Sequence, residues 1–328
     1  MSRVGAVVIG RNERERLKGC LRSLASRVDL VVYVDSGSTD GSVEHARSVG
    51  VEVIELDTSR PFSAARARNS GFLGVRDLRA DVELVQFVDG DCELIDGWLD
   101  RAVAVMGERA EVAVVCGRTK EANRSGSIYK RLCDMEFEHA SGYVDSCGGI
   151  FLARAEALER IGGFDETIVA GEEPELCLRL RKSGWSILRL DDAMVWQDSG
   201  IERFRQWWKR SMRSGHAYAE AMDRHGPEGE RFGVRESVSI WMWGLGPLIL
   251  GAGLAWPTHY WSLLVLVLYP LQALRIAMRR QRLQGNRIGD AALYGTFVML
   301  GKWAQMTGQV RYWSNRIRGR QGGLIEYK

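Results

Sequence analysis

Short apolar runs alternate with amphipathic stretches near the start of the chain. The runs Val4–Ile9, Leu30–Val34 and Val51–Leu56 have the length and composition of buried strands. Between them, Glu15–Ala25 and Ser42–Val49 have the 3.6-residue spacing of helices that bury one face. A strand–helix–strand repeat of this kind predicts a mostly parallel sheet with helices on both faces.

The same alternation continues with predicted helices at Ser63–Leu78 and Trp98–Met106 and predicted strands at Val85–Val88 and Val112–Cys116. Together these elements predict a Rossmann-like, nucleotide-binding α/β half over roughly the first 120 residues. Neither a G-x-G-x-x-G fingerprint nor a P-loop follows the first strand. Both absences count against a dinucleotide cofactor and a P-loop nucleotidase.

Beyond residue 146 the pattern changes to shorter elements. Glycines precede an apolar strand at Cys147–Leu152, and helices are predicted at Ala155–Ile161 and from Gly171–Leu176 onward, where Pro174 suits a first turn. Ile201–Arg224 is a long polar helix with interspersed tryptophans and arginines. It is either a solvated helix with an aromatic core stripe or a basic, aromatic surface for a membrane or a phosphate.

An uncharged stretch of 38 residues, Ser237–Leu274, follows. A single helix of that length would be about 57 Å long, too long for a ~30 Å hydrocarbon core. Two helices of about 18 residues with a turn at Trp256–Tyr260 fit better and predict a membrane hairpin; the alternative is a pair of buried core helices. Ala291–Gly301 is too short to span and is expected to be interfacial or re-entrant. The expected domains are therefore 1–225, an α/β domain, and 226–328, with the hairpin at about 237–274.

Charge is unevenly distributed. Residues 275–328 hold 11 Lys/Arg and 2 Asp/Glu, whereas the whole chain has a net charge of only +3. Because this basic tail follows the apolar stretch, anionic lipid headgroups are a better partner than nucleic acid. Basic residues flank both ends of the stretch, which places both ends on the cytoplasmic side.

Val4–Ile9 is too short for a signal peptide. The six cysteines form no zinc or disulfide pattern, which favours a reducing compartment.

Two acidic groups carry candidate chemistry. Asp89-Gly90-Asp91 directly follows the predicted strand Val85–Val88, and carboxylates at that spacing suit Mg²⁺ or Mn²⁺ holding a substrate phosphate. The alternative is an ordinary Asp-Gly surface turn. Glu172 and Glu173 open a helix, where they either cap it or supply a general base for an attacking hydroxyl.

Six stretches in this order resemble the family 2 glycosyltransferases with the GT-A fold, over about residues 4–225. The matching stretches are Val8–Glu13, Val34–Gly41, Ala67–Asn69, Asp89–Asp91, Gly162–Asp165 and Gly171–Leu176. The apolar tail is similar to that of bacterial membrane-anchored members.

The resemblance implies a role for each matching residue. Arg11, Glu13 and Asp35 would line the nucleotide base pocket, and Arg68 would lie near the nucleotide or its phosphates. Asp91 would ligate the metal, with Asp89 on the ribose or the metal's water. Glu173, beside the substrate-binding Glu172, occupies the position of the catalytic base.

Two departures from the family pattern bear on these roles. The base position is a glutamate rather than an aspartate, and Gln197 stands where many relatives have a metal-binding histidine. An amide oxygen suits Mg²⁺ better than softer ions. The Q-x-x-R-W motif of processive members is absent from residues 206–210, which favours transfer of a single sugar.

The resemblance therefore implies an inverting, metal-dependent enzyme that transfers one sugar from a nucleotide-diphosphate sugar to a lipid-linked or glycan acceptor. Its location would be the bacterial inner membrane, with the catalytic domain in the cytoplasm. A nucleotide-sugar-binding membrane protein with weak or no catalysis is the alternative. A nucleotidyltransferase would share the metal carboxylates but gains no support from Gly171–Leu176.

Overall fold

The structure, a computed structural model, describes residues 2–226 and 230–319. The chain divides into two compact units. The first runs to Gly126 and resumes over Glu136–Gly200, and the second comprises Ser127–Met135 and the chain from Ile201 onward. Each unit is described by itself.

The first unit contains one mixed sheet and six helices within its described residues. The elements, in chain order, are β1 (Val4–Gly10), α1 (Glu15–Leu24), β2 (Leu30–Asp35), α2 (Ser42–Ser48), β3 (Glu52–Glu55), α3 (Ala64–Leu78), β4 (Leu84–Asp89), β5 (Cys92–Leu94), α4 (Trp98–Glu108), β6 (Val112–Glu121), β7 (Gly142–Tyr143), β8 (Phe151–Arg154), α6 (Ala155–Ile161), α7 (Glu172–Lys182) and β9 (Ser186–Gln197). All the strands and helices that periodicity predicted before residue 120 are confirmed.

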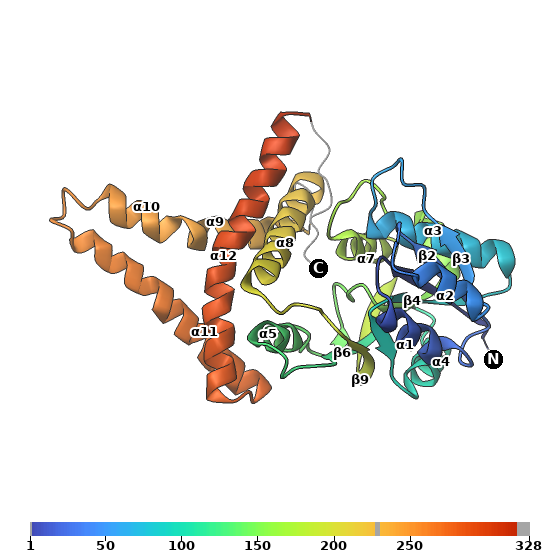
Figure 1. The fold of residues 1–328 in the computed structure, drawn as a ribbon. Coiled ribbons are helices and arrows are strands. Elements are labelled where there is room, and N and C mark those ends of the chain that lie inside the picture. The colour runs from blue at the N-terminus through green and yellow to red at the C-terminus, as the bar shows by residue number, and fades with distance from the viewer. Residues whose placement is uncertain (1, 227–229, 320–328) are drawn as a thin grey trace. The chain divides into compact units, whose positions relative to one another are not determined.

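The sheet order is β3-β2-β1-β4-β8-β6-β9-β5, with β7 beside β9. The first four strands are mutually parallel, and α3 lies on the face opposite α1 (Figure 1). The expectation of a mostly parallel sheet holds for this half only. In the other half, β8 runs antiparallel to both β4 and β6, and β5 and β7 run antiparallel to β9.

The core of this unit fills both faces of the sheet. The central strands are buried along most of their length, and the largest fully buried side chains include Tyr33, Phe87, Trp98 and Phe151. Phe87 on β4 and Phe151 on β8 stack with their ring centres 5.0 Å apart. Burial of β4 on both sides fixes the position at which its last residue, Asp89, leaves the sheet.

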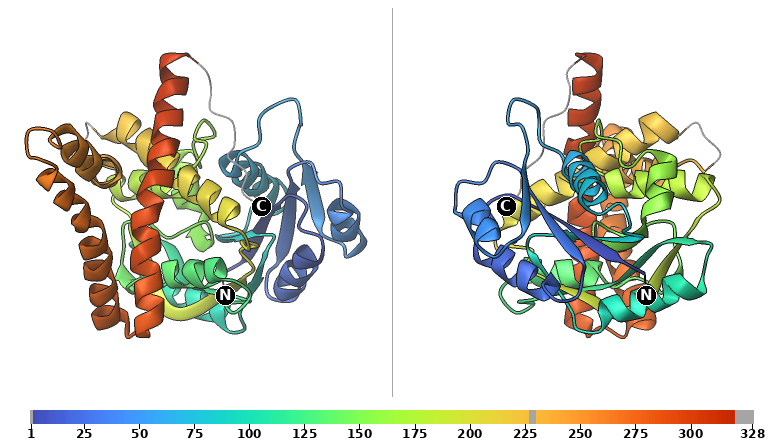
Figure 2. Two further views of the ribbon diagram at one scale, coloured as in Figure 1. Left: turned by 60° about the vertical axis from the view of Figure 1, so that its left-hand side comes forward. Right: turned by 90° about the vertical axis from the view of Figure 1, so that its right-hand side faces the viewer.

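The described residues of the second unit form helices alone. They are α5 (Ile128–Glu136), α8 (Phe204–His225), α9 (Val234–Gly244), α10 (Gly246–Gly253), the 3₁₀ helix η1 (Trp261–Val267), α11 (Leu268–Gln284) and α12 (Ile288–Ile317). The long α12 packs against α8 and α11 (Figures 1 and 2). By packing, α8 belongs to this unit, whereas the sequence placed it before the expected boundary at residue 225.

The expected hairpin is only partly correct. The turn lies at residues 254–260, as predicted. The first arm is not one helix of about 18 residues, because α9 ends at Gly244 and α10 starts at Gly246. Pro247 has no backbone N–H to donate, and the two glycines lower helix propensity, so a break here has a physical cause. Within the described residues, one helical segment, Trp261–Gln284, is long and apolar enough to cross a membrane.

Ala291–Gly301 is not a separate short helix. This stretch is part of the 30-residue helix α12, and it buries Ala291, Gly295 and Met299 against other helices. Its placement at a membrane interface stays a prediction. Small residues at four-residue spacing build a contact face without a long apolar run, so hydropathy alone does not reveal it. The end of the expected basic tail, residues 320–328, lies outside the described residues.

Candidate active site

The candidate site lies at the carboxyl edge of the parallel strands. In the sheet register, Gly10 at the end of β1 is opposite Asp35, and Ile9 is opposite Asp89. Arg11, Asp35 and Asp89 are therefore neighbours at one edge, although they are far apart in sequence. Ligands of open α/β sheets bind at this edge.

The loop after β1 is held to the loop after β2. Asn12 receives a hydrogen bond from Thr39 N–H (2.8 Å), and its own N–H donates to Ser38 Oγ (2.8 Å). Asn12 has a φ of 56°, which is uncommon outside glycine. The Arg11 guanidinium lies over the Phe62 ring, 5.4 Å from its centre. The two loops thus form one ordered rim beside the strand ends.

Two acidic residues of this rim face the protein itself. The Asp35 carboxylate is 1% exposed and accepts hydrogen bonds from Tyr33 Oη (2.7 Å) and from the backbone N–H groups of Gly37 (2.8 Å) and Ser38 (2.7 Å). Burial, together with this contact, raises the pKa of Tyr33. Glu13, 8% exposed, pairs with Arg16 at 2.7 Å. Both carboxylates therefore order the loops that surround the predicted base pocket.

The Asp-Gly-Asp segment forms a tight turn between β4 and β5. Gly90 N–H donates to Ile9 O (2.8 Å), and a Cβ at Gly90 would lie 3.2 Å from Glu13 Cγ and 3.3 Å from Ile9 O. Glycine is therefore needed for the close approach of the turn to β1. Asp91 is 4% exposed, and its backbone O accepts from Asp198 N–H (3.2 Å). Gln197 is paired with Cys92, so the sheet places Gln197 beside Asp91.

A buried arginine connects the turn to α7. Arg68, 3% exposed, donates to Glu172 Oε1 (2.7 Å), Asp89 Oδ1 (3.0 Å) and Gly149 O (3.2 Å). Burial alone would lower the pKa of Arg68, but the carboxylates of Asp89 and Glu172 outweigh it and raise that pKa. A Cβ at Gly149 would lie 2.7 Å from Arg68 Nη2, so this glycine makes room for the guanidinium.

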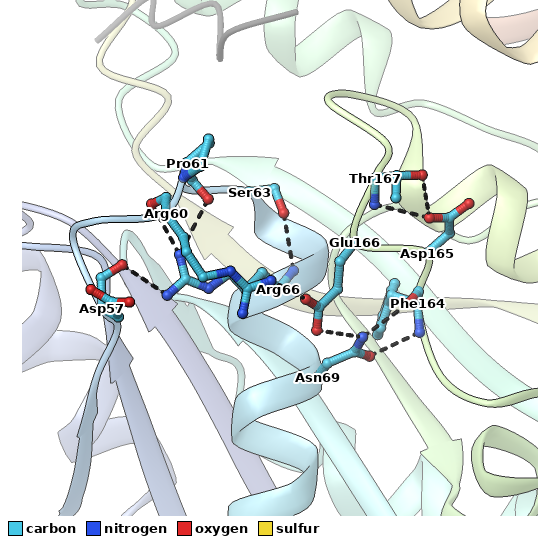
Figure 3. A network of polar contacts seen from close by, with 10 residues as sticks. All are labelled: Asp57, Arg60, Pro61, Ser63, Arg66, Asn69, Phe164, Asp165, Glu166 and Thr167. Carbon is cyan, nitrogen blue, oxygen red and sulfur yellow. Dashed lines mark hydrogen bonds and ion pairs between the residues drawn. The ribbon is translucent and has the colours of Figure 1, made fainter. Parts of the chain in front are cut away.

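The helix that carries Arg68 is fixed to the neighbouring loops. Figure 3 shows the Asn69 amide facing the backbone of Phe164, to which it donates (2.9 Å) and from which it accepts (2.8 Å). Three residues earlier, the Arg66 guanidinium donates to Asp57 O (2.8 Å) and Arg60 O (3.1 Å). These contacts hold the loop before α3 and the loop before α7 to the same helix.

Glu173 is turned toward two thiols. It is 5% exposed, and its Oε1 accepts from Cys147 N–H (2.6 Å), Cys147 Sγ (3.0 Å) and Cys177 Sγ (3.1 Å). Burial raises the pKa of Cys147 and raises that of Cys177 to about 11, so both thiols are protonated donors at neutral pH. In the part of the chain described, Glu173 Oε2 has no hydrogen-bond partner.

The structure therefore brings most of the sequence-predicted residues together. Arg11, Glu13, Asp35, Asp89 and Asp91 lie along one edge, and Arg68 joins Asp89 to Glu172 at the start of α7.

The sequence predicts no role for four residues that hold the site residues in place. They are Asn69, Gly149, Cys147 and Cys177. Only the last left a usable signal, because Glu173 and Cys177 are four residues apart on one helix face.

The donor set at the turn fits a hard divalent cation. Asp91 and Asp89 offer carboxylate oxygens and Gln197 an amide oxygen, from strand ends that the sheet register places side by side. Mg²⁺ and Mn²⁺ take oxygen ligands, and Mg²⁺ commonly uses one or two carboxylates and completes its shell with substrate phosphates.

A parallel half-sheet with loops ordered around its carboxyl edge, an acidic turn and a buried arginine defines the class of open α/β domains, in which ligands bind at that edge. Residues 6–162, just under half of the chain, match the sequence model of glycosyl transferase family 2. The match ends before Glu172, Glu173 and Gln197.

Comparison with known proteins supports the same class. Over 239 residues the chain is 29% identical to pre-mycofactocin glycosyltransferase of Mycobacterium tuberculosis, covering 68% of this chain and 48% of the relative. The chain thus spans about half the length of this relative. It is 23% identical to glycosyltransferase AglE of Haloferax volcanii over 274 residues, covering 79% of this chain and 84% of AglE.

A solved structure of the same fold is the mannosyltransferase PcManGT of Pyrobaculum calidifontis, in complex with GDP-Man and Mn²⁺. It has a TM-score of 0.57 and 18% sequence identity, and the match covers 96% of this chain and 88% of PcManGT. At this identity the likeness establishes the GT-A fold alone.

Proposed function

We propose that the protein is an inverting glycosyltransferase that moves one sugar from a nucleotide-diphosphate sugar to a hydroxyl of a lipid-linked or glycan acceptor. The observation that carries the proposal is the contact of Arg68 with both Asp89 (3.0 Å) and Glu172 (2.7 Å). It joins the edge where a nucleotide binds to the helix that carries the candidate base. Donor and base must be held together for an in-line attack.

In this proposal the rim of the sheet holds the nucleotide. Arg11 is exposed and its guanidinium lies over Phe62, at the rim where a base or phosphate would bind. Asp35 and Glu13 shape the pocket from beneath, and backbone groups of the ordered loops face the base. Arg68 contributes a fixed positive charge next to the phosphates.

Asp91, Asp89 and Gln197 would hold Mg²⁺ or Mn²⁺. The bound cation would offset negative charge that develops on the leaving diphosphate. The neighbour of the same fold carries GDP-Man and Mn²⁺, so GDP-mannose with either cation is the first donor to test.

Glu173 is the proposed general base. Its Oε1 is anchored by one backbone N–H and two thiols, which leaves Oε2 to accept the acceptor hydroxyl's proton. A glutamate reaches one methylene further than an aspartate, and the anchoring of Oε1 limits that extra freedom. The acceptor oxygen then attacks the anomeric carbon on the face opposite the diphosphate, which gives inversion.

We place the protein at the bacterial inner membrane with the first unit in the cytoplasm. Trp261–Gln284 supports this location, because only 6% of its most apolar 18-residue stretch is buried. Trp256, in the turn beside it, is 84% exposed, and Trp261, the first residue of the segment, is 72% exposed. Tryptophans at the end of an exposed apolar segment are typical of a membrane interface.

The alternative is a nucleotide-sugar-binding membrane protein without catalysis. The observation that favours it is the burial of Glu173 against Cys147 and Cys177, since an anchored carboxylate makes a less mobile base.

A transfer assay with the Glu173→Gln variant separates the two. We expect kcat to fall by about 10²- to 10⁴-fold, because the amide accepts no proton, while the donor's Kd stays unchanged. Glu156→Gln, on the exposed face of α6, is the matched control and should behave as wild type. Undiminished turnover in Glu173→Gln would remove Glu173 from its role, and donor binding without any transfer by the wild type would favour the binding protein.

A further inference from the structure

Three potential metal ligands converge at the candidate base, which is one of them. Cys147 Sγ, Cys177 Sγ and a Glu173 carboxylate oxygen lie within 4.8 Å of one another, and all three residues are buried. Cys177 and Glu173 lie one turn apart on α7, and Cys147 comes from the loop before β8. The cysteine spacing along the chain shows no zinc pattern, because the fold and not the sequence brings these atoms together.

The distances suit a small thiophilic ion. The two sulfurs are 3.6 Å apart, and Glu173 Oε1 lies 3.0 Å and 3.1 Å from them. A triangle of this size leaves a point about 2.2 Å from every corner, close to Zn–S and Zn–O bond lengths of roughly 2.3 Å and 2.0–2.2 Å. Two sulfurs bonded to one tetrahedral ion are about 3.8 Å apart, so the observed pair needs little adjustment.

The surroundings keep the ligands in place. Arg189 Nη2 donates to Ser146 O (2.9 Å) and Cys147 O (3.4 Å), which fixes the loop that carries Cys147. A third buried thiol, Cys116 on β6, is close enough to act electrostatically on Cys147. Cys116 is not among the three converging ligand atoms, so a water would occupy the fourth position.

We propose that Cys147, Cys177 and Glu173 form a binding site for a thiophilic divalent cation of the Zn²⁺ type, separate from the oxygen site at Asp91. Thiolate ligands select Zn²⁺ over Mg²⁺ and Mn²⁺, which prefer oxygen. Each ligating thiol releases its proton to solvent, and the ion takes the place of those protons beside Glu173 Oε1. The consequence for activity rests on the proposed function: the bound ion neutralises the base, Glu173, and thereby inhibits sugar transfer.

The test measures binding before activity. The full-length protein, kept reduced with a non-chelating phosphine, is titrated with Zn²⁺ against a chromogenic chelator and with Cd²⁺ for thiolate-to-metal charge-transfer absorption. We expect one sulfur-bound ion per chain, in the wild type and equally in Asp91→Asn, which lacks the main oxygen ligand. Cys147→Ala and Cys177→Ala should lose the absorption band and bind Zn²⁺ at least about tenfold more weakly. Cys133→Ala, at a buried cysteine of α5 in the other unit, is the matched control.

Two results would overturn the proposal: no charge-transfer band with stoichiometric Cd²⁺, or a band that survives in the Cys147→Ala/Cys177→Ala double variant. If those variants fail to fold, X-ray absorption of the zinc-loaded wild type decides instead, with two sulfur scatterers at about 2.3 Å expected and none contradicting the site. The activity arm is separate. A wild type with the sulfur band but no transferase activity contradicts the proposed function and leaves the site standing.

Discussion

The two units bury different kinds of groups. The first encloses a charged network, in which Arg68 (3% exposed) contacts Asp89 and Glu172. The second brings helix backbones together through glycines: a Cβ on Gly308 of α12 would lie only 2.0 Å from Met212 O of α8. Buried charge is expensive unless it is paired, so a protein keeps it where it has a use. Close backbone packing needs only small residues.

The outer surfaces differ in the same sense. In the second unit, large apolar side chains are solvent-exposed along α10, η1 and α11, as at Ile249 (61%), Leu264 (60%) and Leu271 (54%). An exposed apolar surface of this extent marks a binding or membrane surface. The first unit is thus built around a polar site, and the second around apolar contacts between helices, with further large apolar side chains exposed.

The largest expected effect is on the charged network. Arg68→Leu leaves Asp89 and Glu172 facing each other without a cation, and the free energy of unfolding should fall by about 3–5 kcal/mol. Denaturant unfolding of the first unit, followed by hydrogen exchange in β4, measures it. Arg47→Leu, which breaks the exposed pair with Glu55, is the control and should change little, because solvent screens that pair. Equal losses in both variants would mean that the buried network stabilises the protein no more than a solvent-exposed ion pair does.

The next effect concerns the apolar surface. Leu271→Asp places a charge within the candidate span, at a cost of about 3 kcal/mol for membrane insertion. Flotation with anionic vesicles should show most of the variant unbound. Leu283→Asp, at a residue that is 68% exposed against 54% for Leu271, lies beside the arginines at the very end of the same segment and should float like the wild type. If Leu271→Asp binds as well as wild type, this segment does not enter the bilayer.

The sequence predicts more of the first unit than of the second, because apolar periodicity reveals buried strands and amphipathic helices but not contacts between small residues. The strands β1 to β4 and the helices between them follow from apolar periodicity, and their order places Asp35, Asp89 and Asp91 at one edge. The short strands β5 and β7, with three and two residues, carry no periodic signal and depend on distant partners. The apolar run that ends at Leu152 predicts β8, but not that β8 runs antiparallel to β4 and β6.

Contacts between distant residues escape prediction even when each residue is noticed. Arg68 and Glu172 were both expected in the site, yet nothing in the chain shows that they touch across 104 positions. In the second unit the helix α12 escapes because its contact face is made of glycine and alanine, which hydropathy scales scarcely register.

A third prediction tests acid sensitivity of the helical unit. Burial, with help from Arg311 and Arg213, lowers the pKa of His216 to about 4, although Glu220 Oε2 lies 3.8 Å from its Nδ1. Between about pH 6.5 and 4 the unfolded chain takes up a proton that the folded protein does not. Stability is therefore complete above this window and falls within it as pH drops, by at most about 1.4 kcal/mol per pH unit.

Thermal unfolding of the second unit across pH 4–7 checks this. His216→Gln should flatten the slope, and His45→Gln, in the first unit, should leave it as in the wild type. A slope that persists in His216→Gln would assign the acid sensitivity to other groups.

The smallest effect, and the most discriminating for the helix packing, compares two glycines of one helix. Gly308→Ala forces a methyl against Met212 O at 2.0 Å, which requires α8 and α12 to separate, and should destabilise the second unit by about 1–3 kcal/mol. Gly289→Ala, in the first turn of α12, meets nothing within 4 Å and should be neutral or stabilising by up to about 1 kcal/mol, because alanine has the higher helix propensity. Opposite signs in thermal unfolding would show that backbone contact holds these helices together, whereas equal small effects would mean that α8 and α12 do not approach so closely.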